Sequence, residues 1–269
     1  MWKKKTREIE RKDGIMKKAT GRKDNGKIIG ETWLHKFLGG VIALSLIFIF
    51  LISSFEIGIY SDFDFYEKEY SKYGVEEQLD MEMEDIMEVT EYMMSYLRGK
   101  EEVLSIETMV EGERQDFFNE QDRLHMEDVQ GLFLGGLSLR RATFIILIAG
   151  VIALFALKGN WKKIIPYMYE RILAVFAVVI VALGVLISQN FTKCFVIFHE
   201  LFFDNDLWMF DPEYDYMIRM LPEGFFFDMV IRIAVIFIVM LLGSLIVCVI
   251  SKRLDRKKRM LIRKTYKTV

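Results

Sequence analysis

Four long apolar runs constrain this sequence more than any other feature. They cover residues 37–55, 142–157, 172–187 and 229–250, and no Asp, Glu, Lys or Arg lies at the middle of any run. About 20 apolar residues in a helix span the hydrocarbon core of a bilayer, so we expect four transmembrane helices. The length of the runs argues against a large soluble α-helical protein. The lack of charge at membrane depth argues against transporters, pumps and channels.

Charged residues make up 28% of the chain, and their sign changes from segment to segment. Residues 1–34 and 251–269 are basic, whereas carboxylates outnumber Lys and Arg in residues 60–138. Basic segments beside a span stay in the cytoplasm. We therefore expect two basic cytoplasmic tails around a four-span domain at 35–250, with residues 60–138 and 190–228 extracytoplasmic. Since a basic tail beside a span is commonly a topology signal, we expect no nucleic-acid partner.

The two extracytoplasmic segments differ in character. In the first, Ile86, Val89, Met93 and Leu97 recur at helical spacing, which predicts a small helical domain. The second is unusually aromatic, and aromatic side chains favour the boundary between lipid and water. The expected fold class is therefore an all-α integral membrane protein. It has four transmembrane helices, a helical extracytoplasmic domain between spans 1 and 2, and interfacial helices between spans 3 and 4.

Two of the 3 histidines lie in these extracytoplasmic segments. In a helix, Asp122 and Asp128 lie one turn on either side of His125, on the same face. His199 is followed directly by Glu200. We expect the four spans to bring the two imidazoles together at one face of the membrane, with the three carboxylates as supporting or orienting groups.

Three kinds of chemistry fit two histidines beside carboxylates. A metal site is one, because imidazole and carboxylate bind several divalent ions. However, no His-Glu-x-x-His motif and no cysteine cluster occurs, so we expect neither a metal nor another cofactor. A nucleophilic triad is another, but the sequence has no Gly-x-Ser-x-Gly elbow. The third is general acid–base catalysis by histidine alone, which suits a reaction whose nucleophile belongs to the substrate.

Carboxylates around a catalytic base create a conflict. Full charge on both Asp122 and Asp128 would keep His125 protonated and unable to accept a proton. We therefore expect that these two residues do not both contact the ring as carboxylates.

Aromatic residues surround His199 in the sequence. We expect them to form the wall of a pocket for acyl chains, with His199 at its rim; they are Phe198, Phe202, Phe203 and Trp208. An interfacial anchor without chemistry is the alternative, and the two interpretations are compatible.

Three motifs stand in order between the four spans. They are Asp122-x-x-His125-Met126-x-Asp128-Val129, Phe198-His199-x-x-Phe202-Phe203 with Trp208, and Leu221-Pro222-x-x-Phe225-Phe226. In these motifs the sequence resembles the lipoprotein intramolecular transacylases of Gram-positive bacteria, formerly an uncharacterised integral membrane protein family. The resemblance covers residues 37–250 and leaves the amino-terminal extension outside. Asp122 stands where a glutamate is expected, which is a mild chemical change.

The resemblance implies an acyltransferase that acts within one lipoprotein. The sn-2 acyl chain of a diacylglyceryl-cysteine would move to the free α-amine of the same cysteine, giving a lyso-form lipoprotein. His125 and His199 would be the catalytic pair, and the partners would be diacylglyceryl-modified lipoproteins and membrane lipids. Which histidine acts as base stays open at this point. A metal-dependent membrane hydrolase and a non-enzymatic envelope sensor or assembly factor are the alternative functions.

Overall fold

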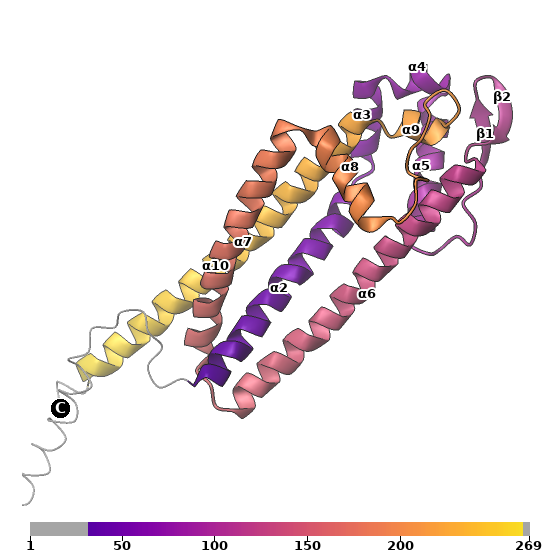
Figure 1. Cartoon of the computed structure of the whole chain (residues 1–269). Helices are drawn as coiled ribbons and strands as arrows, with labels where there is room; N and C mark the ends of the chain where they lie inside the picture. Colours follow the sequence, from indigo (N-terminus) through magenta and orange to yellow (C-terminus); the bar gives the residue numbers. More distant parts are fainter. Residues whose placement is uncertain (1–31, 266–269) are drawn as a thin grey trace, which may run out of the picture.

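The computed structural model describes residues 32–265, so most of the predicted amino-terminal tail lies outside the described residues. Four long helices lie alongside one another, and a smaller head sits at one end of them (Figure 1). The long helices are α2 (Trp33–Tyr60), α6 (Glu120–Ala156), α7 (Trp161–Gln189) and α10 (Glu223–Thr265). Each is long and apolar enough to cross a membrane, and each contains one of the four apolar runs. The predicted four-span architecture is confirmed.

Helix α2 lies between α6 on one side and α7 and α10 on the other (Figure 1). Its glycines permit close packing. A Cβ at Gly39 would lie 2.5 Å from a side-chain carbon of Ile164 on α7, and one at Gly58 would lie 2.7 Å from Ile233 on α10. These distances are below van der Waals contact, so a larger residue would push the helices apart. Side chains of α2, α7 and α10 form a small core at their meeting point: Ala43, Ile47, Tyr169, Phe237 and Leu241.

Helix α6 extends well beyond its apolar run. It contains 37 residues, which at 1.5 Å per residue gives a length of about 55 Å. The hydrocarbon core of a bilayer is about 30 Å thick. The apolar carboxy-terminal part of α6 therefore spans the membrane, and its charged first turns lie outside the membrane-spanning segment, within the head. His125 is placed in these first turns.

The head is built from the two segments that link the spans. The first segment contributes α3 (Asp64–Tyr73), α4 (Val75–Leu79) and α5 (Met83–Leu97), followed by strands β1 (Glu107–Val110) and β2 (Glu113–Asp116). The second contributes α8 (Phe191–Phe202) and α9 (Tyr216–Met220). The apolar residues that recur at helical spacing in the sequence form the buried face of α5. They are Ile86, Val89, Met93 and Leu97, and all lie in the core of the head.

The β1–β2 hairpin departs from the expectation of helices alone. The strands pair in antiparallel fashion, with Glu107 opposite Asp116. Glu111 and Gly112 between them have φ angles of 53° and 76°, the left-handed conformation that a two-residue hairpin turn requires. Glycine adopts this conformation at no steric cost. The chain thereby reverses direction just before α6 and brings β2 to the start of that helix.

Candidate active site

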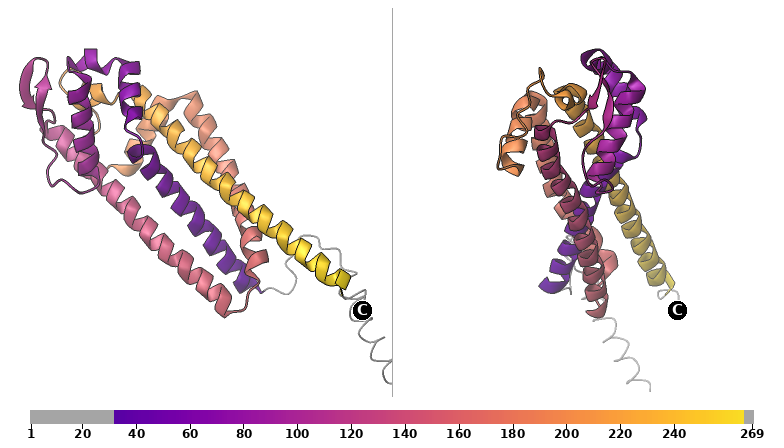
Figure 2. Two further views of the ribbon diagram at one scale, coloured as in Figure 1. Left: turned by 180° about the vertical axis from the view of Figure 1, so that it is seen from behind. Right: turned by 90° about the vertical axis from the view of Figure 1, so that its right-hand side faces the viewer.

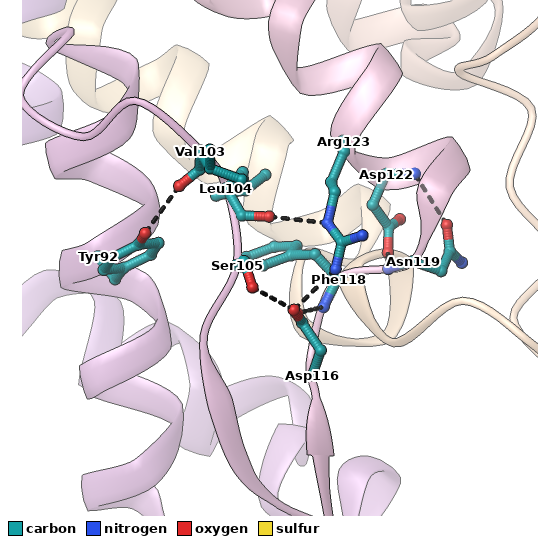
Figure 3. A network of polar contacts seen from close by, with 9 residues as sticks. All are labelled: Tyr92, Val103, Leu104, Ser105, Asp116, Phe118, Asn119, Asp122 and Arg123. Carbon is teal, nitrogen blue, oxygen red and sulfur yellow. Dashed lines mark hydrogen bonds and ion pairs between the residues drawn. The ribbon is translucent and has the colours of Figure 1, made fainter.

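Helix α6 begins with a reciprocal cap. The backbone N–H of Asp122 donates to Oδ1 of Asn119 over 2.9 Å, and the backbone N–H of Asn119 donates to Oδ2 of Asp122 over 3.0 Å (Figure 3). This exchange pairs two backbone donors that a helix amino terminus leaves without partners. The spacing Asn-x-x-Asp therefore sets where α6 starts, and with it the direction in which His125 points.

Asp116 ties this start of α6 to the hairpin. Its carboxylate accepts from Nη2 of Arg123 over 2.7 Å, from the backbone N–H of Phe118 over 3.0 Å, and from the hydroxyl of Ser105. Arg123 also donates from Nε to the carbonyl of Leu104 over 3.0 Å. Figure 3 shows these side chains converging on the first turn of α6. Because several bonds act together, the first turns of α6 are held rigidly.

His199 is fixed from its own helix. It lies near the end of α8, whose first turn is capped by Asn190. The Nδ1 atom of His199 lies 2.7 Å from the carbonyl oxygen of Phe195, one turn earlier. A carbonyl can only accept, so Nδ1 must carry the proton, and in the neutral ring Nε2 keeps a free lone pair. His199 is therefore oriented as a proton acceptor.

The two imidazoles lie together, as the sequence predicts. Their ring centroids are 6.1 Å apart and their planes are 28° from parallel. Both rings are buried, with relative exposures of 5% for His125 and 7% for His199. Figure 2 shows that α8 and the segment after it lie beside the amino-terminal end of α6 in two further views. The rest of α6 and all of α7 lie between His125 and His199 in the sequence. The packing of the helices therefore brings the two rings together.

Aromatic rings enclose the pair. Phe203 and Phe210 lie against His125, with centroid distances of 5.1 Å and 5.3 Å. Trp208 stacks on His199 at 4.9 Å and 30°. These contacts remove water from both imidazoles and leave them few alternative orientations.

Polar contacts from α6 hold the segment that carries Trp208. Gln121 donates from Nε2 to the carbonyls of Leu207 and Met209 over 3.0 Å and 3.1 Å. Asn205 donates from Nδ2 to Asp128 over 2.9 Å. Farther along the segment, Asn119 donates from Nδ2 to Asp215 over 2.5 Å. Helix α6 and its cap residue Asn119 therefore carry His125 and also hold the segment that follows α8 in place beside both imidazoles.

The environment favours the neutral form of both histidines. Burial, and then the nearby His199, lowers the pKa of His125 to about 4, against an opposing effect of Asp128. Burial also lowers the pKa of His199, against the hydrogen bond to the Phe195 carbonyl. At neutral pH both rings are therefore uncharged, and His199 can accept a proton.

The three predicted orienting carboxylates have different positions. Asp122 has a relative exposure of 0%, and burial raises its pKa to about 7. Asp128 is half-buried and bonded to Asn205. Glu200 is exposed, and within residues 32–265 no hydrogen bond or ion pair joins it to either histidine. Full charge on Asp122 would conflict with a neutral His125, and the raised pKa of Asp122 lessens that conflict because it favours the uncharged carboxyl.

The predicted pocket wall is found partly in contact with the histidines. Phe203 and Trp208 pack on the rings as described above. Phe198 and Phe202 lie on the outer face of α8 with exposures of 46% and 50%, although the ring of Phe198 still lies 5.4 Å from that of His199. They present an apolar surface next to the buried pair.

Several site residues cannot be identified from the sequence pattern. Phe210 contacts His125 only because the chain folds back after α8. Gln121, Asn119 and Asn205 act through side-chain bonds to distant backbone or carboxylate groups. Only Asn119 has a local signal, since Asn-x-x-Asp is a helix-start pattern. Among the described residues no group of three or more His, Cys, Asp or Glu side chains is placed to hold a metal ion.

Comparison with known proteins identifies the family. The sequence model of a family described as lipoprotein intramolecular transacylase Lit matches residues 40–226. An uncharacterised protein of Aquifex aeolicus is 27% identical over 201 residues, which are 72% of this chain and 87% of that protein. The structure of the membrane-integral lipoprotein intramolecular transacylase Lit from Bacillus cereus is similar with a TM-score of 0.68 and 27% identity, over 84% of this chain and 98% of that one. The same protein with one histidine replaced by alanine gives a TM-score of 0.63, over 84% of this chain and 96% of that one. The chain therefore belongs to the lipoprotein intramolecular transacylase family.

Proposed function

We propose that the chain moves the sn-2 acyl chain of a diacylglyceryl-cysteine lipoprotein onto the α-amine of the same cysteine. The product is an N-acylated lyso-form lipoprotein. The observation that carries this proposal is the contact between two neutral, buried imidazoles, one of which has its Nε2 lone pair free. Family membership supports a membrane acyl transfer of this kind.

The reaction requires little from the enzyme beyond proton transfer and orientation. The amine nitrogen attacks the ester carbonyl, so a C–N bond forms and the ester C–O bond breaks. Nε2 of His199 accepts the proton that the amine loses and later passes it to the departing glycerol oxygen. Nucleophile and ester belong to one molecule, so no serine or cysteine of the protein has to form an acyl intermediate. Holding the two groups close supplies much of the rate.

His125 takes the second role. Because its pKa is lowered to about 4, it does not serve as a strong acid or as a base at neutral pH. A neutral imidazole can still donate a hydrogen bond from a ring N–H to the oxygen of the tetrahedral intermediate. A fixed donor in a site without water stabilises such an oxyanion strongly. His199 is thus the base, and His125 is the oxyanion donor.

The proposed site lies at the outer leaflet. The basic segments at both ends of the chain favour cytoplasmic termini. With four spans, the head and both histidines would then be extracytoplasmic. Diacylglyceryl-modified lipoproteins reach such a site from the membrane. The exposed rings of Phe198 and Phe202 beside the pair offer an apolar surface for their acyl chains.

A crossover experiment tests this proposal. Full-length protein in liposomes is given two synthetic diacylglyceryl-cysteine lipopeptides that differ both in peptide and in sn-2 chain length, with a strong chelator present. We expect each peptide to acquire only its own sn-2 chain as an amide, as seen by mass spectrometry. Exchange of chains between peptides would contradict intramolecular transfer. Free fatty acid as the product, or loss of the reaction in chelator, would indicate a metal-dependent hydrolase instead. Unchanged lipopeptides would favour a non-enzymatic role.

A further inference from the structure

Two buried polar atoms in the first turns of α6 have no hydrogen-bond partner among the described residues. They are Oδ1 of Asp122 and Nδ1 of His125. The other oxygen of Asp122 is occupied by the backbone N–H of Asn119. Buried polar atoms in native proteins are nearly always paired, because leaving one unpaired costs about 1–3 kcal/mol. A buried pair of orphaned atoms at a catalytic histidine therefore calls for a role.

No hydrogen bond joins the two atoms in the structure, but the spacing of their residues on the helix places the two side chains within reach of each other. Asp122 and His125 are three residues apart on α6, and residues with that spacing have Cβ atoms about 5–6 Å apart on one face. Asp122 is fully buried, and His125 is exposed to only 5%. The remaining faces of the His125 ring are covered by Phe203, Phe210 and the ring of His199. None of these three offers Nδ1 a carboxyl group.

We propose that Asp122 is a positioning residue for the acyl transfer: as a neutral carboxylic acid it donates its O–H to Nδ1 of His125. This bond fixes the ring proton on Nε2, where His125 needs it to stabilise the oxyanion. The proposal rests on the proposed function and deepens it. It assigns opposite tautomers to the two rings, since the Phe195 carbonyl holds the proton of His199 on Nδ1.

The surroundings of Asp122 favour its protonated form. Burial has the largest effect on its pKa, and the carboxylates of Asp215 and Asp116 raise the pKa further. The backbone N–H of Asn119 and the guanidinium of Arg123 oppose this rise. On the side of His125, the facing groups are His199, which lowers the pKa of that ring, and Asp128, which raises it. Loss of the proton from Asp122 would turn the donor into an acceptor. An acceptor draws the ring proton to Nδ1 and leaves Nε2 with a lone pair facing the oxyanion.

Asp122→Asn separates this role from that of a carboxylate. An asparagine can accept from the Asn119 N–H with its oxygen and donate to Nδ1 with its amide nitrogen, at any pH. Asp122→Ala keeps neither bond. Glu127→Gln is the matched control, because Glu127 is an exposed carboxylate on the same helix. Rates of lyso-form production are measured for full-length protein in liposomes between pH 6 and 9.

The decisive quantity is the rate of each variant divided by the wild-type rate at the same pH, since titration of the substrate amine cancels in this ratio. We expect the Asp122→Asn ratio to rise as pH increases through about 7 and the Glu127→Gln ratio to stay flat near one. Asp122→Ala should be roughly 10–100-fold slower than wild type below pH 7. An Asp122→Asn ratio that falls with pH would show that the carboxylate is the active form and would overturn the inference. A flat ratio would overturn it as well, by leaving only a structural role.

The two proposals fail in distinguishable ways. If either His125→Ala or His199→Ala makes lyso-form product at the wild-type rate, the proposed function is wrong. If both histidine variants are inactive but the Asp122→Asn ratio does not rise with pH, only the inference about Asp122 is wrong.

Discussion

The imidazole of His125 on α6 lies beside that of His199 on α8, with ring centroids 6.1 Å apart and planes 28° from parallel. Each ring is fixed from a different direction. His199 is held by the carbonyl of Phe195, and His125 is held by aromatic packing and by the rigid start of its helix. Rings that are placed independently can present different nitrogens to one substrate, and this is what a base and an oxyanion donor require.

The stacking of Trp208 on His199 should affect the rate of acyl transfer. Replacing Trp208 by alanine removes the ring that lies 4.9 Å from the imidazole, whereas Trp208→Phe keeps an aromatic surface. An aromatic pair contributes about 0.5–1.5 kcal/mol, so we expect a fall of up to about 10-fold in kcat for alanine and a smaller fall for phenylalanine. Rates of lyso-form production in liposomes measure this. Equal rates for the two variants would show that the ring itself is unimportant.

Gln121 should act on the same segment through its backbone. Gln121→Ala removes the bonds to the carbonyls of Leu207 and Met209 and touches neither histidine. We expect faster proteolysis between α8 and α9 and a several-fold lower rate. Limited proteolysis followed by mass spectrometry locates the cleavage. Gln78→Ala is the control, since Gln78 bonds a carbonyl elsewhere in the head. Cleavage at the same rate in Gln121→Ala and wild type would contradict the assigned role.

Stability should depend on pH through Asp122. Its pKa is raised from 3.8 to about 7 in the folded protein, so between these values the folded state holds a proton that the unfolded state has lost. Stability therefore decreases as pH rises across that window and is lowest above it. We expect Asp122→Asn to unfold at a higher temperature than wild type at pH 8. The difference, on the order of 4 kcal/mol at most, should shrink toward pH 4.

Thermal unfolding in detergent at several pH values tests this prediction. Glu127→Gln again serves as the control and should follow the wild type at every pH. A wild-type protein that is more stable than Asp122→Asn at pH 8 would mean that the carboxylate form is the one the fold accommodates.

The sequence predicts most of the architecture because its signals are local. Apolar runs of sufficient length identify α2, α6, α7 and α10 without reference to their neighbours. The spacing of Ile86, Val89, Met93 and Leu97 identifies the buried face of α5 in the same way. The β1–β2 hairpin is missed because its strands have only four residues each, which is too short for a clear period. Its turn pair Glu111–Gly112 is the one usable signal.

The sequence singles out the rare residues of the candidate site but not the common ones. His125 and His199 stand out because the chain has 3 histidines. The different positions of Asp122, Asp128 and Glu200 have no local signature, since burial depends on how α6 and α8 meet. The tautomer of His199 depends on the side-chain orientation that directs its Nδ1 to the carbonyl of Phe195. Such features follow from tertiary structure and cannot be inferred from spacing.

The most direct test of the central claim is a double-mutant cycle on the two histidines. His125→Ala, His199→Ala and the double variant are compared with wild type, as full-length proteins in liposomes, by mass spectrometry of the lipopeptide amino terminus. We expect each single variant to lose roughly 10²–10⁴-fold in rate. The double variant should be no slower than the slower single one, because groups that act as a unit are not additive. Lyso-form product at the wild-type rate from either single variant, or fully additive losses in the double variant, would contradict the account.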